Sequence, residues 1–541
     1  MSYITSPVAP TTPSLLKRLR VPIIVLFVAA PIIAAPFVWS HLDLPEEAVL
    51  PLNQIAWLTA VASILMVAVW WLFLSSFRWF IVLPVALLAA MAGGLGVLAI
   101  SKFELTATGS GLVPRIRWAW ESSAEDQLAT HLDQEKQHHG DALPAIDATV
   151  GPEDFAEYRG PKRDGVVPYL TLETDWSKHP PEVLWRLPCP GGYGGVAVAG
   201  NIVVTLQQRG DQEVIVCYDR ATGRQRWAYA YDAYHKDVMG DGPRSTPTIH
   251  AGRIFTVGAT GELVCMSVAG QKQWSINILE DSRAKNIKWG LTASPLIVGD
   301  LVIAHAGIDP DQPQAAALVA FEQATGKKRW AAGMRRAGYG SPQLVTLAGV
   351  AQILIYDGEG LASFGTNGKE LWNIPWKTKF DMNMIQPVIV GEDRVFISAE
   401  ASEGCALYRV KNAENSWNVE AVWQNKNLGA RYANPVSDGK NLYALHSLPG
   451  ELRCLDLATG RIRWKGDRHG PGQMLLTKNA LLVVSDKGVV TLHALDTAEN
   501  EELARFAVLN EKTWNTPALA GDQLFVRNQH EIACIKLPRR K

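Results

Sequence analysis

The chain has 541 residues, too many for one ordinary core, because domains cluster near roughly 100 to 200 residues. Several domains or one repeat array are therefore expected. Lys and Arg number 52 against 53 Asp and Glu, and the resulting formal charge of -1 argues against nucleic acid as a partner held by a basic face. The six cysteines include no C-x-x-C and no adjacent pair, which excludes a zinc ribbon and a dithiol redox motif.

Three stretches near the amino terminus carry no charged side chain: residues 21–39, 55–77 and 79–101. Each is close to the roughly 20 residues that a helix needs to cross a bilayer, so the sequence predicts three transmembrane α-helices over 21–101. The second and third form a hairpin, because one helix of their joint length would exceed about 30 Å of hydrocarbon. The competing interpretation of the first stretch, a cleaved signal peptide, is disfavoured by its length and by Pro36.

Charges around these stretches are uneven. Basic residues precede the first helix within 1–20 and Arg78 lies in the hairpin turn, whereas the first loop holds Asp43 and Glu46. Basic segments stay on the cytoplasmic side, so residues 1–20 are expected in the cytoplasm. Three crossings then place everything after about residue 101 outside it, and we expect an integral inner (cytoplasmic) membrane protein with its large domain in the periplasm.

The segment 102–151 shows no strand alternation and is predicted to be a linker or stalk. Its residues 118–137 are polar and favour a helix. His131, His138 and His139 lie nearby, but no acidic or cysteine ligand completes a recognised spacing. The sequence therefore predicts no metal site.

A turn followed by a Trp recurs through the rest of the chain. In residues 454–464 (CLDLATGRIRW), an apolar strand runs into a Thr-Gly turn, and a Trp follows in the next strand. Glycine at such a turn supplies a positive φ, so each copy predicts a β-hairpin. The copies are about 41 to 56 residues apart, which fits a four-stranded propeller blade. Their aromatic positions are Trp185, Trp227, Trp274, Trp330, Trp372, Trp423, Trp464 and Phe506.

The first strand of each unit has its own pattern, a polar residue followed by Pro, as in Thr246-Pro247 and Ser294-Pro295. Counting two degenerate copies near Gly195 and Gln473, there are eight such starts. The last unit lacks an outer strand, and residues 181–188 have nothing else to pair with. We therefore predict that these two ends pair and close an all-β eight-bladed propeller over 152–541, which removes two exposed sheet edges.

The repeat A-x-D-x-x-T-G-x-x-x-W resembles the tryptophan-docking motif of the pyrroloquinoline quinone (PQQ) propeller superfamily. That superfamily includes quinoprotein alcohol dehydrogenases and the lipoprotein propeller of the outer-membrane assembly machinery. The resemblance covers about 152–537 and implies that the seven repeated tryptophans dock neighbouring blades. Residues 157–166 (EYRGPKRDGV) and 237–247 (DVMGDGPRSTP) also resemble a bacterial subgroup of PQQ-binding-like repeat proteins.

The resemblance to the PQQ propeller superfamily implies a quinone cofactor, which can be tested on the residues of this sequence. The dehydrogenases that the chain resembles often stack PQQ on two adjacent disulfide-bonded cysteines, opposite a Trp, with Ca²⁺ held by Glu, Asn and Asp. No adjacent cysteines exist here. Membrane-bound glucose dehydrogenases lack the pair too, so its absence weakens the enzyme interpretation without removing it. The cysteines recur at equivalent places in several units, which favours small buried side chains: Cys217, Cys265, Cys454 and Cys534.

Residues just before each first strand should converge at one mouth of the central channel, because all first strands run in the same direction. Asp237 and Asp241 could suggest Ca²⁺ ligands, but D-x-x-x-D-G lacks the further oxygens of a calcium loop, which favours a turn. Arg244 is expected to pair with one of the two. A polar and aromatic funnel of this kind suits a ligand, and we expect it to contain Asp237, Asp241, Arg244, Trp289, Tyr339, Asn383, Tyr432, Trp514 and Asn515.

These observations favour a membrane-anchored, extracytoplasmic propeller that acts as a binding or assembly platform in the cell envelope, with envelope proteins as partners. The alternative is a PQQ-dependent quinoprotein oxidoreductase, resembling alcohol or sugar dehydrogenases and coupled to membrane quinone. The first is preferred because the recognisable cofactor residues are missing. No cofactor is expected in that case, and PQQ with Ca²⁺ belongs to the alternative.

Overall fold

The computed structural model describes residues 142–540 except 238, 308–315, 415 and 448, together with 122–137, the backbone of 104–108 and 113–117, and a few short helical stretches before residue 92. Apart from those stretches, the predicted anchor over 21–101 lies outside the described residues. In the part described, no helix combines the length and apolarity needed to span a membrane. The larger of two compact units, residues 106–115 with 121–541, contains the propeller.

A two-stranded sheet and a helix lie between residue 101 and the propeller in the sequence. Strands β1 (Glu104–Thr108) and β2 (Val113–Arg117) form a two-stranded sheet, so the prediction of a linker without strands over 102–151 is wrong for these residues. Helix α5 (Ala124–Gln137) occupies most of the expected helical segment. It begins at Ala124 because Ser123 and Asp126 form a reciprocal cap: the Asp126 N–H donates to the Ser123 hydroxyl and the Ser123 N–H to the Asp126 carboxylate, both at 3.0 Å.

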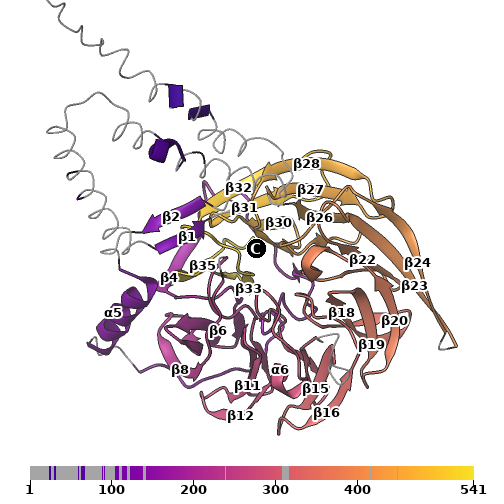
Figure 1. Ribbon diagram of the computed structural model, residues 1–541, viewed down its shortest axis with the longest axis horizontal. Coiled ribbons are helices and arrows are strands. Elements are labelled where there is room, and N and C mark those ends of the chain that lie inside the picture. Colours follow the sequence, from indigo (N-terminus) through magenta and orange to yellow (C-terminus); the bar gives the residue numbers. More distant parts are fainter. Residues whose placement is uncertain are drawn as a thin grey trace, which may run out of the picture. The chain divides into compact units, whose positions relative to one another are not determined.

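The rest of the chain forms eight sheets arranged in a ring (Figure 1). Blade 1 contains β5 (Ala197–Ala199), β6 (Ile202–Arg209), β7 (Gln212–Asp219) and β8 (Gln225–Asp232). Blade 2 contains β9 (Thr248–His250), β10 (Arg253–Val257), β11 (Glu262–Ser267) and β12 (Lys272–Asn277). Blade 3 contains β13 (Leu296–Val298), β14 (Leu301–His305), β15 (Leu318–Glu322) and β16 (Lys328–Ala332). Blade 4 contains β17 (Gln343–Leu347), β18 (Val350–Asp357), β19 (Gly360–Gly365) and β20 (Glu370–Pro375).

Blade 5 contains β21 (Val388–Val390), β22 (Arg394–Ser398), β23 (Cys405–Ala413) and β24 (Ser416–Asn425). Blade 6 contains β25 (Val436–Ser437), β26 (Asn441–His446), β27 (Glu451–Asp456) and β28 (Ile462–Arg468). Blade 7 contains β29 (Gln473–Thr477), β30 (Ala480–Val484), β31 (Val489–Ala494) and β32 (Glu502–Ala507), with β3 (Val166–Val167) added in parallel to β29. Two short helices, α6 (Ile278–Asp281) and η2 (Lys379–Asp381), lie in loops between blades.

Blade 8 closes the ring as predicted. It contains β33 (Ala518–Ala520), β34 (Gln523–Arg527) and β35 (Glu531–Lys536), and its outer strand is β4 (Glu182–Pro188) from the start of the domain. Strands β35 and β4 are antiparallel, with Cys534 opposite Trp185. In Figure 1 the magenta β4 lies beside the yellow β35. The predicted eight-bladed propeller is therefore confirmed.

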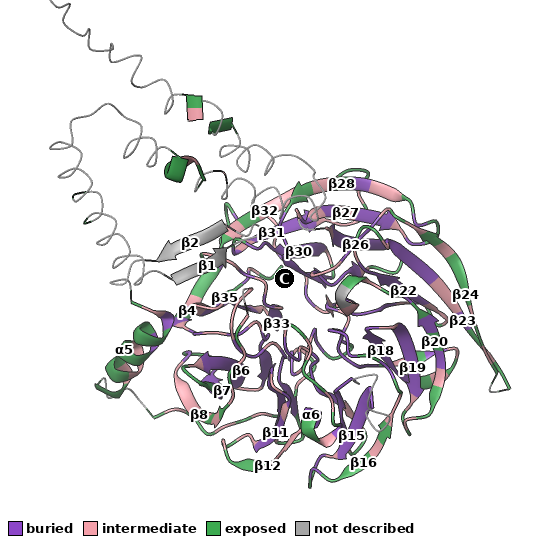
Figure 2. Cartoon of the chain, viewed as in Figure 1, coloured by how far each residue is buried: buried purple, intermediate pink, exposed green. Residues whose placement is uncertain are grey.

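Apolar residues alternate between the faces of the sheets and pack between blades. Strand β6 is buried along seven of its eight residues, whereas the outer strand β8 contains no buried residue. Figure 2 shows the same gradient around the ring, with buried inner strands and exposed outer ones. This gradient is expected when each sheet is covered on both faces by its neighbours and only its outer edge meets solvent.

The repeated Trp and the repeated turn glycine form one contact between blades. The Trp274 ring packs against Gly326 of the next blade, where an added Cβ would lie 2.8 Å from Cδ2 of Trp274. The indole N–H of Trp274 donates to the carbonyl of Gln323 in the same turn (3.0 Å). Trp185, Trp227 and Trp423 make the same hydrogen bond at 2.9 Å. Through this hydrogen bond each of these four tryptophans contacts the next blade around the ring.

Trp372 departs from this contact. Its indole N–H donates to Oε1 of Gln352 in its own blade, at 2.8 Å. The next blade, blade 5, turns between β23 and β24 at Ala413 and Ser416, without the Thr-Gly turn of the repeat. The indole ring of Trp372 therefore has no turn glycine of the next blade to pack against.

The polar residue before each inner-strand Pro links neighbouring blades. The N–H of Thr246 donates to the Ser294 hydroxyl (2.9 Å), and the N–H of Ser294 donates to the Ser341 hydroxyl (2.9 Å). The Gln386 N–H donates in the same way to Oδ1 of Asn434 (2.7 Å). The sequence pattern that marked the inner strands thus encodes a belt of hydrogen bonds around the axis.

A segment before blade 1 fills the axis of the ring; we call residues 154–167 the plug. Arg163, fully buried, donates to the carbonyls of Ser294 and Pro342 at 3.2 and 2.8 Å, and its Nε lies 2.7 Å from the Glu157 carboxylate. Arg159 donates to the carbonyl of Pro435 (3.0 Å). These acceptors belong to blades 3, 4 and 6, so the plug reaches across the axis.

The plug enters from the face that carries the turns between first and second strands. The Asp154 carboxylate accepts the N–H of Gly200, in the turn between β5 and β6, at 3.0 Å and pairs with Arg220 at 2.9 Å. At its other end the chain leaves along β29, where the Lys478 N–H donates to the carbonyl of Leu170 (3.0 Å). The channel is therefore occupied from this face, and the opposite face carries the loops that lead into each blade.

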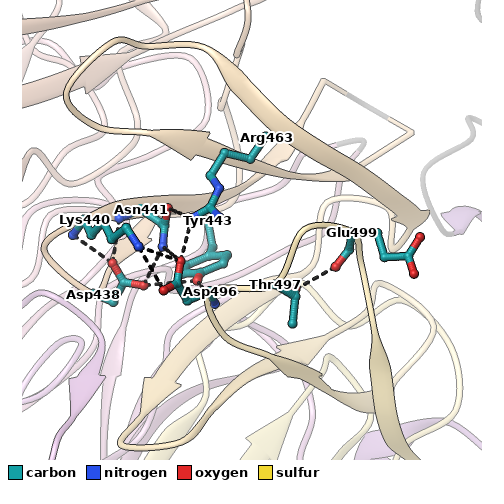
Figure 3. A network of polar contacts seen from close by, with 8 residues as sticks. All are labelled: Asp438, Lys440, Asn441, Tyr443, Arg463, Asp496, Thr497 and Glu499. Atoms are coloured by element: carbon teal, nitrogen blue, oxygen red, sulfur yellow. Dashed lines mark hydrogen bonds and ion pairs between the residues drawn. The ribbon is translucent and has the colours of Figure 1, made fainter.

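A polar network on the plugged face joins blades 6 and 7 (Figure 3). The Asp496 carboxylate, in the turn after β31, accepts hydrogen bonds from Lys440 (2.9 Å), Arg463 (2.6 Å) and Asn441 (3.3 Å). These contacts, led by Lys440, hold the pKa of Asp496 well below its usual range. The carboxylate therefore stays charged and ties the two blades at neutral pH.

Candidate functional site

The loops that lead into the blades meet around the axis on the face opposite the plug entry; we call this region the funnel. Its centre is an aromatic stack. The ring centroid of Trp514 lies 5.9 Å from that of Tyr193 and 5.6 Å from that of Tyr432, with interplanar angles of 29° in both pairs. Loops before blades 1, 6 and 8 supply these three rings, because each inner strand begins at the axis and brings its preceding loop with it.

Lys512 lies against this stack. Its Nζ is 3.7 Å from the Trp514 ring centroid and 5.1 Å from that of Tyr193, which are cation–π distances. It donates a hydrogen bond of 2.5 Å to the carbonyl of Met239. The hydroxyl of Tyr193 donates to the same carbonyl. Lys512 and Tyr193 are therefore joined through one backbone oxygen of the loop before blade 2.

The conformation of that loop, residues 237–244, is stabilised mainly by hydrogen bonds among its own residues. Asp241 accepts the N–H of Asp237 (3.1 Å) and the hydroxyl of Tyr234 (3.2 Å), and Asp237 accepts the N–H of Met239 (2.8 Å). Arg244 donates to the carbonyl of Gly240 (2.9 Å) and lies 4.0 Å from Asp237. The geometry agrees with the turn interpretation of the two aspartates and with the expected pairing of Arg244.

Arg244 also links the loop to the next pair of aromatic side chains. Its Nε donates to the carbonyl of Trp289. The Trp289 ring lies 5.5 Å from the Tyr339 ring, and the Tyr339 N–H donates to the carbonyl of Asn383 (2.9 Å). Lys288 lies 4.9 Å from the Trp289 ring. The wall of the funnel therefore continues across blades 3 and 4.

Two of the expected site residues have a structural role instead. The Asn383 side chain, fully buried, donates to the carbonyls of Asp357 (2.7 Å) and Trp376 (2.8 Å). The Asn515 side chain, also buried, donates to the carbonyls of Gly192 (3.2 Å) and Gly194 (2.8 Å). Both hold loops in place below the funnel surface, because an amide is the side chain that can pair with two buried carbonyls there.

The other expected residues do lie around the funnel, and two members were missed. Tyr193 and Lys512 were not predicted, although each stands near the start of an inner strand as Arg244 and Tyr432 do. Tyr193 lies within a glycine-rich segment, residues 191–195, next to the degenerate first-strand start near Gly195. Its position before blade 1, equivalent to that of Tyr432 before blade 6, is the signal that could have found it.

The cysteines contribute nothing to the funnel. All six are buried and none forms a disulfide. Burial raises the pKa of the Cys217 thiol to about 12, and the same cause raises that of Cys534 to about 12. Protonated, enclosed thiols are poor nucleophiles and poor metal ligands, so the interpretation of these residues as small core side chains is confirmed.

Fold and funnel together define the class, an eight-bladed propeller built from tryptophan-docked repeats. The chain matches the profile of the family described as outer membrane protein assembly factor BamB over residues 178–277 and 234–466, which together make up more than half of its length. It belongs to this family. No curated protein matches the sequence.

Solved structures share the architecture. A quinohemoprotein alcohol dehydrogenase from Comamonas testosteroni is similar with a TM-score of 0.51 and 10% sequence identity, over 76% of this chain and 84% of the dehydrogenase. BamB from Moraxella catarrhalis gives a TM-score of 0.44 and 13% identity, over 64% of this chain and 94% of its own. The likeness to the dehydrogenase shows the fold alone.

The residues of the funnel do not fit the quinone cofactor of such dehydrogenases. A calcium ion beside the quinone needs several oxygen ligands, yet no group of three acidic, His or Cys side chains suited to a metal occurs among the described residues. The carboxylates of Asp237 and Asp241 are engaged within their own loop. The Trp514 ring, the natural stacking surface, already contacts Tyr193, Tyr432 and Lys512.

Proposed function

We propose that this protein is a membrane-anchored, extracytoplasmic binding platform of the cell envelope, and that its funnel binds an envelope protein. One observation carries the proposal: the funnel presents Trp, Tyr and Arg side chains that are fixed by mutual contacts, as in Tyr193, Trp514 and Tyr432. These residue types dominate the binding energy of protein interfaces. A preformed surface also loses little conformational entropy on binding.

The position of the plug supports the same proposal. Arg159 and Arg163 fill the axis from the opposite face and are almost fully buried. A partner therefore reaches the axis only from the funnel side. Since the residues in the funnel do not fit PQQ with Ca²⁺, no observation of this structure favours the quinoprotein oxidoreductase, and it remains the alternative to be tested.

Photocrosslinking in cells that produce the full chain tests the platform. A photoreactive residue at the exposed position 288, on the funnel rim, should give a discrete adduct of fixed mass. The same residue at the exposed position 250, at the far end of β9, is the control and should not. Adding Trp514→Ala should abolish the adduct from position 288. Equal adducts from both positions, or none from position 288, would contradict the proposal.

The anchor and the orientation are tested separately. The charge asymmetry around 21–101 motivates a cytoplasmic amino terminus and an external propeller. A cysteine introduced at the exposed Gln134 of α5 should react with an impermeant reagent added to cells whose outer barrier has been opened but whose inner membrane is intact. Labelling only after lysis would reverse the proposed topology.

A further inference from the structure

Lys512 is the one feature of the funnel that a passive binding surface does not require. A surface lysine normally keeps its ammonium in water, whereas this one is half-buried between two aromatic rings and donates to a backbone carbonyl. The acceptor, the Met239 carbonyl, carries no full negative charge. The ring faces of Trp514 and Tyr193 and this carbonyl therefore replace only part of the hydration that the charged form of Lys512 has lost.

The groups that face Lys512 come from several loops. Arg244, in the loop before blade 2, adds a like charge, while Asp237 of the same loop and Asp486, which follows β30, act in the opposite direction. Burial is the largest effect and, with Arg244, lowers the pKa of Lys512 to about 7. At neutral pH a large share of Lys512 is thus the unprotonated amine, the form that attacks carbonyl carbon.

We propose that Lys512 is a nucleophilic amine and that the funnel binds small aldehydes or ketones covalently, as imines on its Nζ. The lone pair of Nζ forms a bond to the carbonyl carbon while the carbonyl π electrons move to oxygen, and a proton passes from nitrogen to that oxygen. The resulting carbinolamine loses one water molecule and leaves a C=N bond. No oxidant, metal or cofactor takes part, and the net change is amine plus carbonyl to imine plus water.

Tyr193 is placed to move the proton. Its hydroxyl and Nζ of Lys512 both donate to the Met239 carbonyl, so they lie on the same side of the stack. Burial raises the pKa of Tyr193 well above its ordinary value, which keeps the phenol protonated at neutral pH. The hydroxyl can therefore give a proton to the departing oxygen and recover one from nitrogen. This site does not depend on the binding-platform function.

Reductive trapping tests the proposal on the native full chain in detergent. The protein is incubated at pH 7 with acetaldehyde and cyanoborohydride, and ethylated lysines are quantified by peptide mass mapping. Lys288, exposed on the same rim, is the internal control. Because the neutral fraction of an ordinary lysine at pH 7 is smaller by roughly a thousandfold, Lys512 should be ethylated at least about ten times faster than Lys288 despite its burial. A rate equal to or below that of Lys288 would overturn the proposal.

The pH profile separates an activated amine from a merely accessible one. Ethylation of Lys512 should reach half its maximum near pH 7, well below the pH of about 10 that is ordinary for a lysine. Arg244→Gln removes the neighbouring positive charge and should move the Lys512 midpoint to higher pH. Tyr193→Phe keeps the ring and should slow trapping several-fold without moving the midpoint. A Lys512 midpoint near pH 10 in the native protein would also overturn the proposal.

Discussion

At the residue scale, the turn glycine and the tryptophan of the repeat work as a pair. Gly326 has a φ of +72° and packs against the Trp274 ring, so its role combines backbone conformation with close approach. Gly252 has nearly the same φ, +73°, but an added Cβ there would meet nothing within 4 Å. The two glycines thus differ only in what surrounds them.

Gly326→Ala should therefore destabilise the fold more than Gly252→Ala. The left-handed conformation alone costs about 1 to 2 kcal/mol in either variant, and the clash with Trp274 adds about 1 to 3 kcal/mol. Denaturant unfolding of both variants measures the difference. Equal losses of stability would show that the stability of the propeller does not depend on a small residue at the turn that contacts Trp274.

His305 gives a prediction about pH. It is buried, its Nδ1 lies 2.8 Å from the Ala317 carbonyl, and its Nε2 accepts the N–H of Gly338 (3.2 Å). This pairing requires the neutral ring with its proton on Nδ1. Burial lowers the pKa of His305 to about 4, below the ordinary value of about 6.5.

As the pH falls below about 6.5, the unfolded chain binds a proton at this position before the folded chain does, so folding stability decreases until about pH 4. The total loss from this one group is about 3 kcal/mol. Thermal unfolding between pH 7 and 5 should show the decrease, and His305→Gln should make it smaller. Part of the decrease should remain, because burial also lowers the pKa of His469 to about 4. The exposed His250, changed in the same way, is the control and should leave the slope unchanged.

At the element scale, the plug is a part of the fold that the sequence did not predict. Residues 157–166 show only a resemblance to a bacterial subgroup of repeat proteins, and nothing in them has strand or helix periodicity. Arg163 is nevertheless fully buried, and carbonyls of blades 3 and 4 accept its protons. Contacts that span more than a hundred residues leave no local pattern, so only the structure reveals them.

Arg163→Ala should cost about 3 to 5 kcal/mol of folding stability, because it leaves Glu157 and several buried carbonyls without their partner. Lys162, the adjacent cation, has an exposed side chain. Lys162→Ala should change stability by less than about 0.5 kcal/mol. Chemical denaturation compares the two. A small effect of Arg163→Ala would mean that the plug is not part of the cooperative unit.

The inner and outer strands, by contrast, could be located from the sequence. The Thr-Gly turn placed the hairpin of residues 454–464, and the polar residue before Pro placed the start of β13. Pairing of residues 181–188 with the last unit followed from counting strands. The funnel was only partly predictable. The convergence of the loops correctly predicted that Trp514 and Tyr432 lie in it. The conformation of individual loops, which the sequence pattern does not show, also places Tyr193 and Lys512 there and leaves the Asn383 side chain below the surface.

At the scale of the whole molecule, closure depends on strands from the two ends of the domain. Deleting residues 515–541 removes β33 to β35 and leaves β4 without a partner. Two sheet edges would be exposed at once, so the truncated domain should aggregate or unfold without a sharp transition. Removing only residues 540 and 541 is the control. Melting of the long truncation as sharply as the intact domain would contradict the closed ring.

One measurement tests most directly whether this propeller is a binding protein without quinone chemistry. The purified protein is incubated with PQQ and Ca²⁺, washed, and assayed for retained quinone absorbance and for dye reduction with a panel of alcohols and aldose sugars. Because the carboxylates of Asp237 and Asp241 are engaged within their own loop, we expect no dye reduction above that of the protein without PQQ. Stoichiometric retention of the quinone with dye reduction that disappears in Arg244→Ala but persists in Lys288→Ala would contradict the account and establish an oxidoreductase.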